Sequence, residues 1–185
     1  MRGYKKRIKY SYTSKIFDMA EKDRIATEKV KHEGLFDFKE VYRFLYTMAT
    51  DLEYEIEERL YSEKNTAKGK EIEISWIAKR KISDYFKFHI QFRWLILGMS
   101  DVEVMRDGAK INTNKGSFEI TFSAFLEKDY ENRWESTAFL KFLRGLYDNY
   151  IIRGRVSDYE DKVTEDMVEL VEQLKAFLVL EAAGK

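Results

Sequence analysis

The chain has 185 residues, of which 36% are charged, 44% are hydrophobic and 15% are aromatic. This length suits one domain, and the many aromatic residues exclude wholesale disorder. The 33 basic and 33 acidic residues balance, so the net charge indicates no partner. Because cysteine is absent, disulfides, thiolate metal sites, cysteine nucleophiles and iron–sulfur clusters are excluded.

The first fifteen residues are basic and contain no acidic residue. Aromatic Tyr4, Tyr10 and Tyr12 lie among these cations, and a basic aromatic segment can neutralise phosphates and stack on bases. We interpret residues 1–14 as an arm and 15–185 as a single domain; residues 1–12 could also form a short edge strand. RNA or another anionic surface is a chemically sensible partner, although a solvated terminus is the simpler interpretation. The basic residues concerned are Arg2, Lys5, Lys6, Arg7, Lys9 and Lys15.

Two helices are predicted before the first strong strand pattern. Residues 15–31 carry a weak apolar stripe that ends before Gly34. Asp37 then resembles an N-cap, with Glu40 three residues later. The following apolar residues recur at helical spacing and predict a helix over 37–51; they are Phe38, Val41, Leu45, Met48 and Leu52.

Alternating apolar and polar residues then predict strands. Residues 53–63 could extend the helix, but the turn-like segment 65–69 favours a strand. Further strands are predicted over 71–78, from Tyr85, and over 118–124. Gly98 ends the strand from Tyr85 or forms a bulge in it, and Val102 and Val104 continue its pattern. Asp107-Gly108 is a tight-turn signal. The clearest pattern has six inward apolar residues: Phe86, Phe88, Ile90, Phe92, Trp94 and Ile96.

Two helices are predicted at the C-terminus. The first starts at Asn132 and extends to about 152; the second starts at Ser157, with Glu160 completing a capping box. The segment 141–147 can be a partner-binding helix, but packing in the core is the expected role. We therefore predict a two-layer α+β domain in which a meander of about five antiparallel strands is covered on one face by amphipathic helices.

Catalytic and cofactor motifs are missing. The chain has no phosphate loop, GxGxxG, GxSxG or HExxH motif, and its only histidines are His32 and His89. Glu71 and Glu73 could share a sheet face with His89 for proton transfer, but a solvated histidine is the expected state. The acidic run from Glu53 to Glu58 is likewise expected to be solvated, so no metal or cofactor is predicted. The polar sheet face is a candidate binding surface formed by Lys87, His89, Gln91 and Arg93.

Three segments, GLFDFKEVYRFLY, ISDYFKFHIQFRWLILGMSDVEV and KFLRGLYDNYIIR, begin at residues 34, 82 and 141. They resemble a group of uncharacterised archaeal proteins, and this resemblance implies no activity and no site. The order of helix, meander and helix is similar to that of helix-grip lipid-binding domains. That similarity implies an apolar cavity under a long C-terminal helix, but the second C-terminal helix and the lack of small lining residues depart from the pattern.

These observations favour a non-enzymatic binding or assembly protein that holds an unknown macromolecule. The alternatives are a nucleic-acid or ribosome-associated protein that uses the N-terminal arm, a carrier of an apolar ligand, and an enzyme that uses His89. No apolar run approaches the length of a membrane span, so we expect a cytoplasmic protein. The pattern of residues leaves the oligomeric state open.

Overall fold

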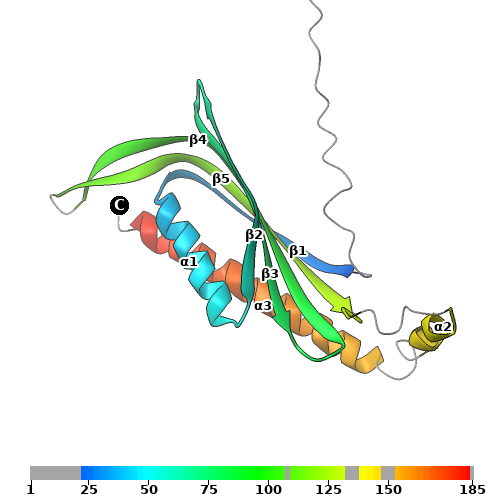
Figure 1. Ribbon diagram of the computed structural model, residues 1–185. Coiled ribbons are helices and arrows are strands. Elements are labelled where there is room, and N and C mark those ends of the chain that lie inside the picture. Colours follow the sequence, from blue (N-terminus) through cyan, green and yellow to red (C-terminus); the bar gives the residue numbers. More distant parts are fainter. Residues whose placement is uncertain (1–21, 107–108, 132–137, 147–152, 184–185) are drawn as a thin grey trace, which may run out of the picture.

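The computed structural model of the chain describes residues 22–106, 109–131, 138–146 and 153–183 (Figure 1). Five strands form one antiparallel sheet in the order β1-β5-β4-β3-β2. The elements in chain order are β1 (Lys22–Phe36), α1 (Phe38–Asp51), β2 (Glu55–Thr66), β3 (Gly69–Lys81), β4 (Phe86–Arg106), β5 (Ala109–Lys128), α2 (Ala138–Leu146) and α3 (Arg153–Ala183).

The predicted inward residues of β4 form the centre of the core. Phe88 and Phe92 are fully buried, and Trp94 is 1% exposed. Helices α1 and α3 lie on the same side of the bent sheet (Figure 1), where Leu45 and Leu170 join the same core cluster. This arrangement follows from the strand period of two, because alternate side chains must lie on one face.

Helix α1 confirms the prediction for residues 37–51. It begins at Phe38, and the Asp37 carboxylate accepts a hydrogen bond from the Glu40 backbone N–H at 3.0 Å. This bond satisfies one of the backbone donors left unpaired at a helix start. Glu40 itself turns outward and forms an ion pair with Arg43 at 2.7 Å.

The helix predicted over 15–31 is wrong for its described part, because residues from Lys22 onward form strand β1. This strand pairs along its length with β5, for example Val30 with Ile120. Val30 is buried while its neighbours Lys29 and Lys31 both form ion pairs with Glu119. A long-range partner therefore overrides a weak helical stripe. The arm over residues 1–14 lies outside the described residues.

The structure confirms all four predicted strands. The strands predicted over 53–63, over 71–78, from residue 85 and over 118–124 correspond to β2, β3, β4 and β5. Val102 and Val104 continue β4 as predicted, and the fifth strand of the sheet is β1. Gly98 forms a bulge with φ 63°, and the pairing with β5 shifts between Leu97 and Ser100. The strands β4 and β5 remain paired up to Arg106 and Ala109, which fits the predicted turn, although residues 107–108 are outside the described part.

The last helix begins earlier than predicted. Helix α3 begins at Arg153, so Gly154 and Ser157 lie inside it and the predicted cap at Ser157 is wrong. The predicted cap at Asn132 lies outside the described residues. Helix α3 is held to the sheet by Asp166, which accepts from the Tyr54 hydroxyl and pairs with Arg80, both at 2.7 Å. No helix in the described residues is long and apolar enough to cross a membrane.

Candidate docking surface

Helix α2 is a nine-residue helix with sequence AFLKFLRGL. Alanine, leucine, lysine and arginine are strong helix formers. At about 100° per residue, four apolar positions fall within an arc of about 100°, and the positions of Lys141 and Arg144 fall on the opposite side of the helix. The four apolar residues are Phe139, Phe142, Leu143 and Leu146.

The apolar face of α2, defined by Phe139, Phe142 and Leu146, is exposed. Their exposed fractions are 69%, 62% and 41%. Figure 1 shows α2 beyond the end of β5, apart from the layer formed by α1 and α3. The expectation that this segment packs in the core is therefore wrong.

Exposure of two phenylalanines on one helix face has an energetic consequence. Full burial of one such side chain contributes about 1.5–3 kcal/mol. Since the two rings are already partly covered, burying the remainder would contribute on the order of 2–4 kcal/mol. Single exposed apolar residues are ordinary, but a contiguous apolar stripe marks an interaction surface.

The charges nearest to this face in sequence are of both signs. Lys141 and Arg144 are the only charged residues of α2, and the first turn of α3 contains Arg153 and Arg155, both exposed. Acidic residues flank the helix in sequence at Glu135 and Asp148, and Asp158, Glu160 and Asp161 follow in α3. The apolar face of α2 therefore lies in a part of the chain with mixed charge.

The four residues of the predicted polar sheet face do point away from the core, but they differ in exposure. Arg93 is exposed and Lys87 is partly buried, with its Nζ 3.9 Å from the centroid of the Tyr130 ring. Gln91 is 8% exposed and His89 only 2%. The expectation of a solvated His89 is therefore wrong.

The partner of His89 is Glu127 on β5. The His89 Nε2 and a Glu127 carboxylate oxygen are 2.5 Å apart, and both side chains are almost completely buried. The predicted partners are elsewhere: Glu73 lies opposite Leu95, six residues along β4 and therefore about 20 Å from His89. The proposed site of Glu71, Glu73 and His89 is not assembled. The sequence pattern missed Glu127 because the recognised alternation on β5 ended at Ala124.

Acidic side chains of β2 accept hydrogen bonds from neighbouring side chains. Glu57 accepts from Lys79 at 2.9 Å, which lowers its pKa. Glu58 accepts from the Trp76 indole at 3.0 Å and from the Tyr42 hydroxyl at 2.8 Å. Burial and the hydrogen bond to Glu58 raise the pKa of Tyr42 to about 12. Within the described residues, no group of histidine and acidic side chains is arranged to hold a metal ion.

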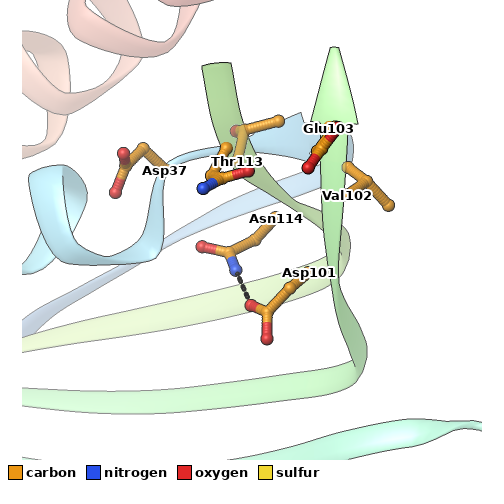
Figure 2. A pocket seen from close by; sticks show the side chains of 7 residues that line it. Asp37, Asp101, Val102, Glu103, Thr113 and Asn114 are labelled. Carbon is orange, nitrogen blue, oxygen red and sulfur yellow. Dashed lines mark hydrogen bonds between the residues drawn. The ribbon is translucent and has the colours of Figure 1, made fainter. Parts of the chain in front are cut away.

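An open groove of about 460 Å³ lies where the start of α1 meets the β4–β5 hairpin (Figure 2). Several of its polar side chains have structural partners. Asn114 donates to Asp101 at 2.8 Å and accepts from the Phe38 N–H at 3.1 Å, and Asp37 caps α1. The polar side chains around the groove therefore hold the start of α1 in place by hydrogen bonds. It is lined by Asp37, Asp101, Val102, Glu103, Asn112, Thr113 and Asn114.

Comparison of the chain with protein-family models, curated proteins and solved structures gives no match. The candidate surface is therefore argued from the chain's own geometry.

Proposed function

We propose that this protein is a non-enzymatic binding protein that docks on a macromolecular surface through the apolar face of α2. In this proposal the sheet, α1 and α3 form a rigid two-layer scaffold, with the amphipathic faces of both helices directed toward the sheet. The role of the scaffold is to present α2 at one end.

The observation that carries the proposal is the exposure of Phe139 and Phe142, at 69% and 62%. Aromatic side chains, phenylalanine included, are enriched at protein interfaces.

The test is sedimentation of extracts from cells that produce the tagged full chain. We expect the wild-type protein to travel with a fraction much larger than its own 22.1 kDa. The variant Phe139→Ser/Phe142→Ser should move to the free fraction. The matched control is Val179→Ser/Leu180→Ser, which changes two comparably exposed residues of α3 and should behave as wild type. Identical profiles for all three proteins would contradict the proposal.

A second candidate is a carrier of an apolar ligand between the sheet and the helices. The observation that favours it is Trp94, whose Nε1–H is buried and has no hydrogen-bond acceptor among the described residues. A buried donor without a partner costs about 1–3 kcal/mol, and a ligand oxygen would relieve that cost. Native mass spectrometry tests this function: a co-purifying small molecule that is lost in Trp94→Phe supports it, and a clean mass of the chain alone contradicts it.

A further inference from the structure

The free edge of the sheet at β2 is a second interaction surface, and it is independent of α2. Strand β2 is the last strand of the sheet and pairs with β3 on one side only. We propose that two copies of the chain pair antiparallel along β2, related by a two-fold axis at Tyr61. The two sheets then join into one continuous sheet.

The edge of β2 is accessible along its length. None of the twelve residues of β2 is buried. In an edge strand, the backbone N–H and C=O groups that do not bond to the neighbouring strand remain available to another strand. Proteins often prevent such pairing with very short or charged edge strands. Strand β2 is long, and the order of its charges favours pairing with a second copy.

The charges of β2 are complementary to themselves in one antiparallel register. When Tyr61 lies opposite Tyr61 of the second copy, Arg59 lies opposite Glu63 and Lys64 lies opposite Glu58. The axis repeats both contacts, and no like charges meet. Every other antiparallel register of β2 on itself gives at most one contact between opposite charges. A two-fold interface requires a self-complementary surface, which selects a second copy of the chain over an unrelated strand.

The bulge in β2 preserves this complementarity. The pairing of β2 with β3 shifts between Glu58 and Leu60. If the extra residue also shifts the pairing between the copies, Glu57 replaces Glu58 opposite Lys64, and the signs remain opposite. Lys64 is exposed and has no ion-pair partner within the described residues, so the second copy supplies one.

Two exposed tyrosines add apolar contact beside the axis. Tyr61 is 47% exposed and Tyr46 of α1 is 46% exposed. Both lie on the face covered by helices, since Tyr61 is opposite the buried Ile74 and the Tyr46 ring is 6.3 Å from that of Trp76. Aromatic pairs directly across two antiparallel strands stabilise a sheet, and the axis places Tyr61 opposite its own copy.

The experiment is sedimentation equilibrium of the purified full chain. With rising concentration, we expect the wild type to shift from the 22.1 kDa of one chain to twice that mass, and salt to weaken the dimer. Arg59→Glu alone and Glu63→Arg alone should each weaken the dimer about tenfold, because each brings like charges together twice across the axis. An equimolar mixture of the two variants should form the dimer again, since each then faces the opposite charge. The control Lys175→Glu reverses an exposed charge on α3 and should behave as wild type.

Unchanged circular dichroism shows that the variants fold, which we expect because Arg59 and Glu63 are both exposed. A wild type that stays a single chain at every concentration overturns the inference. So does a dimer that both charge reversals leave intact, or a mixture of the two folded variants that stays monomeric. A dimer that is lost in Phe139→Ser/Phe142→Ser instead assigns the interface to α2. A chain that becomes dimeric only after deletion of residues 1–14 assigns the edge to its own arm.

Discussion

Asp166→Ala should destabilise the fold strongly, because one carboxylate of α3 satisfies two groups of the sheet layer. It accepts the Tyr54 hydroxyl and pairs with Arg80, whose side chain is 13% exposed. Tyr54 is 2% exposed, and its pKa is raised by burial and then by the hydrogen bond to Asp166.

The magnitude follows from the two groups that lose their partner. An unsatisfied buried hydroxyl costs about 1–3 kcal/mol, and removal of one member of a buried pair costs about 3–5 kcal/mol. Arg80 retains its 2.7 Å hydrogen bond to the Leu52 carbonyl and some contact with water. We therefore expect a total loss of about 2–4 kcal/mol in the free energy of unfolding, below the sum of the two terms.

Urea unfolding followed by circular dichroism measures this loss. With a slope of about 2 kcal/mol per molar urea, the midpoint should fall by about 1–2 M at constant slope. The matched control is Glu172→Ala, because Glu172 pairs with Lys175 on the same helix with both side chains largely exposed. Its cost should stay below about 1 kcal/mol. Equal midpoints for the two variants would refute the assigned role of Asp166.

Three further predictions concern separate parts of the chain. Asp37→Ala should cost about 1 kcal/mol, whereas Asp37→Ser should restore most of it, since either Asp or Ser can cap α1; equal thermal midpoints for the two would contradict this. Hydrogen bonds from Lys31 and then Lys29 lower the pKa of Glu119 to about 2, so its contribution to stability is present above its ordinary pKa and disappears as the pH falls toward about 2. Lys31→Gln should raise that pKa in a carboxyl NMR titration, and an unmoved titration would exclude the pair in solution. Deletion of residues 1–14 should abolish any RNA binding that weakens with salt, and binding that survives the deletion would remove the arm as its source.

The sequence predicted those parts of the fold that depend only on residues close together in the chain. The alternation from Phe86 to Ile96 needs only a strand with one buried face, and the cap at Asp37 needs only its own helix. Strand β1 was missed because its partner β5 is about ninety residues away, and its own apolar pattern is weak. The burial of His89 depends in the same way on Glu127, 38 residues later.

The candidate docking surface was recognised as a segment but assigned to the wrong role. An amphipathic helix has the same apolar periodicity whether its apolar face packs on its own sheet or on a partner. Only the exposure of Phe139 and Phe142 distinguishes the two roles. The rings would be buried if α2 packed on its own sheet, whereas they are mostly exposed in the structure.

The absence of cysteine permits one direct measurement of the central claim, which is that α2 presents a bare apolar face to which a macromolecular partner binds. Leu146→Cys would be labelled with an environment-sensitive fluorophore, and Tyr61→Cys on β2 would serve as the control at similar exposure. We expect water-like emission from both labels in buffer and a blue shift at position 146 alone when an extract of the producing cells is added. A label at 146 that is already blue-shifted in buffer, or that does not respond to the extract, would contradict the claim.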